Sequence, residues 1–92
     1  MRPYKVELKL TAQEDLKRLL KNEPIAYKKA LSLIGELYIH PQTGTGHPEQ
    51  LKGDKAGLWS RRINKKHRLI YEIHETEVIV LILTAYGHYE DK

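Results

Sequence analysis

The sequence predicts an α+β fold in which a strand and a helical hairpin precede a three-stranded antiparallel meander. Apolar residues alternate with polar ones near the N-terminus and in the C-terminal third, whereas they recur at helical spacing in between. Four of the six glycines and two of the four prolines separate these regions, within residues 40–57. Because 92 residues are too few for two ordinary domains, we expect residues 1–92 to form a single domain of order β-α-α-β-β-β.

The N-terminal half contains the signals for one strand and two helices. The strand is indicated by apolar residues that alternate with charged ones: Tyr4, Val6, Leu8 and Leu10. Thr11 and Glu14 then form a capping-box pattern, which predicts a helix over about residues 12–21. Pro24 suits the first turn of a second helix, where its missing N–H costs nothing, and this helix should end before Pro41.

The C-terminal half contains a long loop and then three strand-like runs. The loop covers residues 40–57, and the runs are 58–64, 68–74 and 78–86. The last run is apolar on both faces, so we expect an internal strand that the helices cover on at least one side. A two-residue turn at 65–66 would place Ile63 opposite Arg68, whereas a slip of one residue would invert which arginines share a face.

Composition excludes several classes of protein. The longest apolar run has six residues where a membrane span needs about 20, and the N-terminus lacks the apolar core of a secretory signal, so we expect a cytoplasmic protein with no membrane partner. The absence of cysteine removes disulfides and thiolate chemistry. The glycines do not form a nucleotide-binding pattern, and the five histidines lack metal-ligand spacing. We therefore expect no cofactor and no metal.

Positive charge is concentrated in one segment of the chain. Residues 52–68 hold seven basic residues and one acidic residue, a local charge of +6, whereas the other 75 residues hold 9 basic and 11 acidic ones, a charge of −2. A polyanion such as RNA would be attracted to this segment, because each neutralised phosphate releases counterions. The same charge also fits a solvated hairpin with a basic tip.

Three places in the chain carry groups suited to acid–base or phosphate chemistry, and each also has a plain structural interpretation. Glu49 lies among basic residues, where a carboxylate stays ionised and can take a proton, but it also fits an exposed loop glutamate. Arg68 can hold a phosphate with its forked guanidinium, or it is a hairpin-tip charge. His88 and Tyr89 offer a proton donor and an aromatic face, or a frayed chain end. These residues alone do not assign an active site.

Four motifs together resemble the Txe/YoeB family of toxins of bacterial type II toxin–antitoxin systems, within the RelE/ParE superfamily. They are Pro48-Glu-Gln-Leu-Lys-Gly53, Gly57-Leu-Trp-Ser-Arg-Arg-Ile63, His67-Arg-Leu-Ile-Tyr71 and Gly87-His-Tyr89. The resemblance implies a ribosome-dependent messenger-RNA endonuclease, which inhibits translation. Its partners would be messenger RNA, the ribosome and a cognate antitoxin, YefM/Phd-like or of another type II class. It leaves open whether the toxin is a monomer or a homodimer.

The resemblance also implies roles for individual residues. Glu49 matches the general base, Arg68 the phosphate-binding arginine, His88 the general acid and Tyr89 the C-terminal tyrosine, which can stack on a base. The RNA backbone would be held by Lys52, Lys55, Arg61, Arg62, Lys65 and Lys66. Two alternatives are a non-enzymatic ParE-like inhibitor of DNA gyrase and an RNA-binding module without cleavage. The pair formed by Glu49 and His88 favours the endonuclease, since a blocking protein needs no acid–base pair.

Overall fold

A computed structural model describes residues 3–53 and 56–87, which form one five-stranded sheet and two helices. The elements in chain order are β1 (Lys5–Leu8), α1 (Leu10–Asn22), α2 (Pro24–Leu37), β2 (Glu49–Gln50), β3 (Leu58–Arg62), β4 (Arg68–His74) and β5 (Ile79–Thr84). The strand order is β1-β5-β4-β3-β2, with β1 parallel to β5 and the other neighbours antiparallel. The predicted α+β fold is confirmed, and β2 is an additional short strand inside the expected loop.

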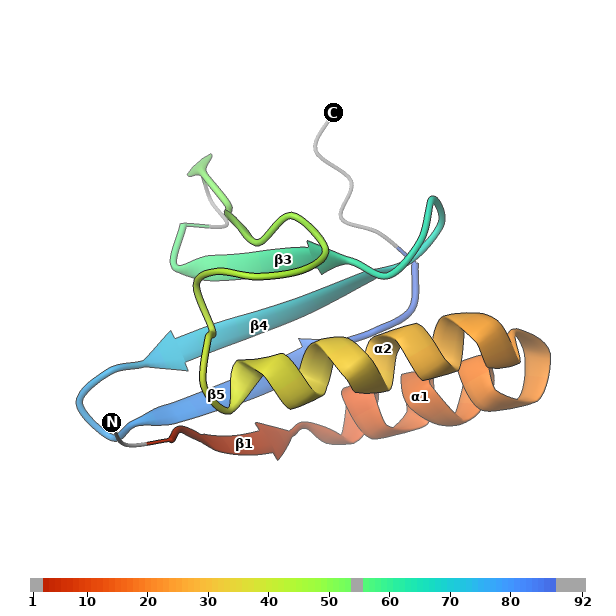
Figure 1. Cartoon of the computed structure of the whole chain (residues 1–92), viewed down its shortest axis with the longest axis horizontal. Helices are drawn as coiled ribbons and strands as arrows, with labels where there is room; N and C mark the ends of the chain where they lie inside the picture. The colour runs from red at the N-terminus through yellow and green to blue at the C-terminus, as the bar shows by residue number, and fades with distance from the viewer. Residues whose placement is uncertain (1–2, 54–55, 88–92) are drawn as a thin grey trace.

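The two helices form an antiparallel pair that lies beside one face of the sheet (Figure 1). Their apolar stripes meet the sheet in one core, whose fully buried members include Leu19, Leu33, Leu37, Leu69, Tyr71, Val80 and Ile82. Strand β5 lies between β1 and β4, so the prediction of an internal strand is confirmed. Pro24 occupies the predicted first turn of α2. Among the described residues, neither helix has the length and apolar character needed to cross a membrane.

The start of α1 differs from the prediction. The helix begins at Leu10, with Lys9 as the N-cap residue and no side-chain cap, so the capping box at Thr11 is wrong. The Thr11 hydroxyl instead donates to the carbonyl oxygen of Leu83, at 2.9 Å. A hydroxyl that has a partner on β5 is not available to cap its own helix, and the sequence pattern around Thr11 does not reveal that partner.

The β3–β4 hairpin adopts the slipped register. Arg62 pairs with Arg68, and the N–H of Ile63 donates to the carbonyl of His67, at 2.9 Å. The two-residue turn is therefore wrong. The turn is closed by the Asn64 side chain, whose Oδ1 accepts the backbone N–H groups of Lys66 and His67, both at 2.8 Å. Because paired residues point to the same face, Arg62 and Arg68 share one face and Arg61 lies on the other.

Candidate functional site

The sheet has two chemically distinct faces. On the face that packs against the helices, Arg61 pairs with the core residue Leu69. The opposite face is called the open face below. Glu49 pairs with Ser60 across β2 and β3, which places Glu49 on the open face as well. The residues of this face around the β3–β4 hairpin are Glu49, Ser60, Arg62, Arg68 and Ile70.

Glu49 and Arg68 lie on the open face two strands apart. Strand spacing and rise place their Cα atoms about 12 Å apart in a regular sheet, a gap that the two side chains and one phosphodiester can fill. Glu49 is exposed and Arg68 is half-buried. Between them lies Ser60, whose buried hydroxyl is, within the described residues, a buried side-chain polar atom without a hydrogen-bond partner. The face thus combines an accessible carboxylate with a guanidinium.

The last described residue, Gly87, is bound to the start of β4. The Arg68 N–H donates to the Gly87 carbonyl at 2.7 Å, and the Gly87 N–H donates to Nδ1 of His67 at 2.8 Å. Gly87 has a φ of 76°, a left-handed conformation that favours glycine. His88 and Tyr89, the other two predicted catalytic residues, lie outside the described residues. The described residues therefore place Glu49 and Arg68 on one face of the sheet, with Gly87 bound to the start of β4.

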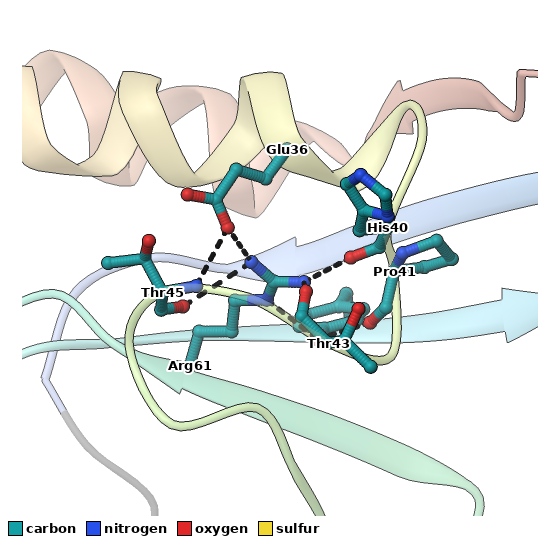
Figure 2. A network of polar contacts seen from close by, with 7 residues as sticks. Glu36, His40, Pro41, Thr43, Thr45 and Arg61 are labelled. Atoms are coloured by element: carbon teal, nitrogen blue, oxygen red, sulfur yellow. Dashed lines mark hydrogen bonds and ion pairs between the residues drawn. The ribbon is translucent and has the colours of Figure 1, made fainter.

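Arg61 occupies the helix face, where its side chain is fully buried (Figure 2). All five of its N–H groups have acceptors. Nε donates to Tyr71 Oη at 3.2 Å, and Nη1 donates to Glu36 Oε1 at 2.6 Å and to the Thr45 carbonyl at 3.3 Å. Nη2 donates to the carbonyls of His40 and Thr43. The expectation that Arg61 holds RNA is wrong, because no donor is left and the group is inaccessible.

The hydrogen bonds around Arg61, called the Arg61 network, hold the segment between α2 and β2 against the rest of the molecule. This segment runs from the end of α2 to the β2–β3 edge of the sheet (Figure 1). Tyr71 Oη donates to the Pro41 carbonyl at 2.8 Å, and the Thr45 N–H donates to Glu36 Oε1 at 2.9 Å. Burial raises the pKa of the Tyr71 hydroxyl. The hydrogen bond from Thr45, with a further contribution from Arg61, lowers the pKa of the Glu36 carboxyl.

The lowered pKa of Glu36 predicts that acid destabilises the fold. The unfolded chain, whose glutamates have ordinary pKa values near 4.5, takes up protons before folded Glu36 does. The stabilisation of the fold by ionised Glu36 is therefore complete above about pH 4.5, and it is lost as the pH falls through the pKa of Glu36 in the folded chain. We expect urea unfolding, followed by Trp59 fluorescence at about pH 7 and about pH 3, to show a smaller acid-induced loss of stability in Glu36→Gln than in the wild type.

Exposed Glu14, on α1, supplies the control for this measurement. Glu14→Gln should lose as much stability in acid as the wild type does. An equal loss in Glu36→Gln would contradict the assignment of Glu36 as an acid-sensitive part of the Arg61 network.

The remaining basic candidates lie near the open face or at the hairpin turn. Arg62 ends β3 and is exposed, as are Lys52 and the turn residues Lys65 and Lys66. The Lys66 Nζ lies 4.0 Å from Glu23 Oε2. Lys55 lies outside the described residues. Arg61 is buried and neutralised by Glu36. The accessible positive charge of residues 52–68 therefore comes from the other basic residues.

Sequence reasoning missed His67, which is 3% exposed and contacts both Gly87 and Glu23. Its partners are 20 and 44 residues away in the chain. A histidine in a turn carries no local signal of such contacts, and only its position directly before Arg68 could have drawn attention to it.

Comparison with known proteins places these features in a family. The family described as "YoeB-like toxin of bacterial type II toxin-antitoxin system" matches residues 8–89 of the chain. Toxin YoeB of Mycobacterium bovis is 44% identical over 54 residues, which make up 59% of this chain and 64% of that relative. The aligned part is thus just under two thirds of the relative's own length.

Three solved structures share the fold along nearly the whole chain. The YoeB/ParE toxin from Agrobacterium tumefaciens has a TM-score of 0.85 and 32% identity, and the match covers 92% of this chain and 99% of that one. The YoeB dimer from Staphylococcus aureus has a TM-score of 0.80 and 31% identity, with 95% and 99% covered. The YoeB-YefM complex from the same organism gives 0.78 and 31%, with 94% and 98% covered.

Proposed function

The chain belongs to the YoeB-like toxins of bacterial type II toxin–antitoxin systems, within the RelE/ParE superfamily, and from this membership we propose that it is a ribosome-dependent endoribonuclease. It would cut translated messenger RNA in the cytoplasm and so inhibit translation. The observation that carries the proposal is that Glu49 and Arg68 lie on the same open face of the sheet. In addition, Arg68 is hydrogen-bonded to Gly87, the residue that directly precedes His88 in the chain.

The proposed reaction needs one base, one phosphate-binding group and one acid. Glu49 takes the proton from a ribose 2′-OH, and that oxygen attacks the adjacent phosphorus. Arg68 stabilises the charge that develops on the phosphorane oxygens. His88 protonates the leaving 5′-oxygen. The products are a 2′,3′-cyclic phosphate and a 5′-hydroxyl, and no metal takes part in a step.

The remaining residues bind and orient the RNA. Tyr89 stacks on a base, a contact that tolerates different sequences. The phosphate backbone is held by the accessible basic residues Lys52, Lys55, Arg62, Lys65 and Lys66, whose positive charge supports long-range attraction of the message and the ribosome.

A cognate antitoxin neutralises the activity. The S. aureus relative has been solved in complex with YefM, which supports a YefM-like partner for this chain, and the separate YoeB dimer supports a homodimer in its absence.

The chemistry of the cut ends tests the proposed function. The purified chain is added to a translating extract and to the same message without ribosomes, and breaks are mapped by primer extension. We expect cuts in the translated message alone. The downstream fragments should accept a kinase-added phosphate without prior phosphatase treatment, because attack by the 2′-OH leaves a 5′-hydroxyl.

Each other outcome has a defined meaning. Fragments that carry a 5′-phosphate would refute attack by the 2′-OH. An intact message in an extract whose translation has stopped would favour binding without cleavage, and inhibition of purified DNA gyrase would favour the ParE-like alternative.

A further inference from the structure

The side chain of His67 is buried between the helical hairpin and the residues that follow β5. Its ring is buried and packs against the ring of Tyr86, with centroids 4.3 Å apart and a tilt of 46°. The Arg18 guanidinium covers Tyr86, with Cζ 3.8 Å from the ring centroid. Packing alone therefore restricts the orientation of the imidazole.

The two ring nitrogens of His67 have different partners, and these assign the tautomer. Nδ1 accepts the backbone N–H of Gly87 at 2.8 Å, so Nδ1 carries no proton. Nε2 lies 2.7 Å from Glu23 Oε2 and must be the protonated nitrogen that donates to this carboxylate. The hydrogen bond from His67 lowers the pKa of the Glu23 carboxyl. Glu23 thereby keeps the imidazole in the tautomer whose Nδ1 can accept from Gly87.

Glu23 itself is fixed in place by its position in the fold. It is the residue between α1 and α2, and its N–H donates to the Leu19 carbonyl at 2.7 Å. The described charged groups near this pair include Lys66, with Nζ 4.0 Å from Glu23, Lys29, which lines the same pocket as Glu23, and Arg18 across Tyr86. The contact therefore connects the helical hairpin to Gly87.

Gly87 connects the buried contact to the open face. Its N–H is held by the His67 side chain, and its carbonyl accepts the N–H of Arg68 at 2.7 Å. The next residue in the sequence is His88. Two neighbouring residues thus bind Gly87: the side chain of His67 accepts its N–H, and the backbone N–H of Arg68 donates to its carbonyl.

We propose that His67, oriented by Glu23, is a positioning residue of the cleavage reaction, because it holds Gly87, the residue that directly precedes the proposed general acid His88 in the chain. The inference rests on the proposed function. A general acid must lie within hydrogen-bond reach of the leaving oxygen, and a small misplacement lowers the rate steeply. His67 touches neither RNA nor the reacting atoms and acts through Gly87 alone.

Two substitutions separate the roles of the ring nitrogens. The Asn side chain of His67→Asn places an oxygen near the position of Nδ1 and keeps an acceptor for Gly87. The longer side chain of His67→Gln places its amide near Nε2 and keeps a donor for Glu23, but it loses the acceptor for Gly87. We expect His67→Gln to lower kcat on programmed ribosomes by about 10–100-fold with KM nearly unchanged, and His67→Asn to recover most of the rate.

A readout independent of activity accompanies the kinetics. Hydrogen exchange of the Gly87 amide should be slow in the wild type and in His67→Asn, and fast in His67→Gln. Thermal unfolding of each variant establishes that the chain is folded at the assay temperature, so that a lower kcat does not reflect unfolded protein.

The outcomes distinguish this inference from the proposed function. A wild-type chain that cuts no translated message overturns the proposed function. A wild-type chain that cuts, together with a His67→Gln variant that cuts equally fast, overturns only the positioning role. Equal losses in His67→Gln and His67→Asn would assign His67 to general packing and would also overturn it.

Discussion

Replacing Glu49 by glutamine is expected to lower the rate of cleavage of translated message by about 10²–10⁴-fold, the usual contribution of a general base. Glutamine has nearly the same shape as glutamate but cannot take the proton of the ribose 2′-OH. Glu49 is exposed on the short strand β2, so the substitution leaves no buried group without a partner. The fold and the affinity for programmed ribosomes should therefore stay unchanged.

Single-turnover cleavage with excess toxin measures this effect directly, because it separates chemistry from binding and release. Glu72→Gln is the matched control, since Glu72 is a carboxylate on the open face of β4, two residues from Ile70 in the direction opposite to Arg68. We expect the control to cut at the wild-type rate. Undiminished cleavage by Glu49→Gln would remove the general base from the mechanism.

The order of elements could be predicted from the sequence because its signals are local. Alternation marks β1, helical spacing marks α1 and α2, and Pro24 marks the break between them. The apolar run of β5 shows its internal position in the sheet. Such patterns depend on neighbours within a few residues, which a single sequence displays.

The candidate site was predicted only in part, because its geometry depends on contacts between distant segments. Glu49 and Arg68 could be selected by their chemistry, but their common face depends on a hairpin register that the sequence left open. Arg61 and Arg62 are alike in sequence, yet Glu36, 25 residues away, makes Arg61 structural. The same limit applies to His67, whose two partners come from other elements.

Arg61→Met is expected to lower the free energy of unfolding by about 3–5 kcal/mol, because it removes a fully buried cation from its half-buried carboxylate and from the carbonyls that it holds. Methionine fills part of the volume but donates no hydrogen bond. Glu36 then keeps a carboxylate without its cation, and the carbonyls of His40 and Thr43 lose a buried donor. Arg61→Lys should recover little, because one ammonium cannot reach acceptors arranged for a guanidinium fork.

The neighbouring arginine provides the matched control, because Arg62 is exposed on the opposite face of the same strand. Urea unfolding followed by Trp59 fluorescence should place Arg62→Ala within about 0.5 kcal/mol of the wild type. The same variant should bind ribosomes more weakly and with a lower salt dependence, since it lacks one phosphate contact. A stable Arg61→Met beside an unstable Arg62→Ala would mean that β3 presents the opposite face to the helices. In that case Arg68, which pairs with Arg62, would also leave the open face, and its proposed phosphate contact with it.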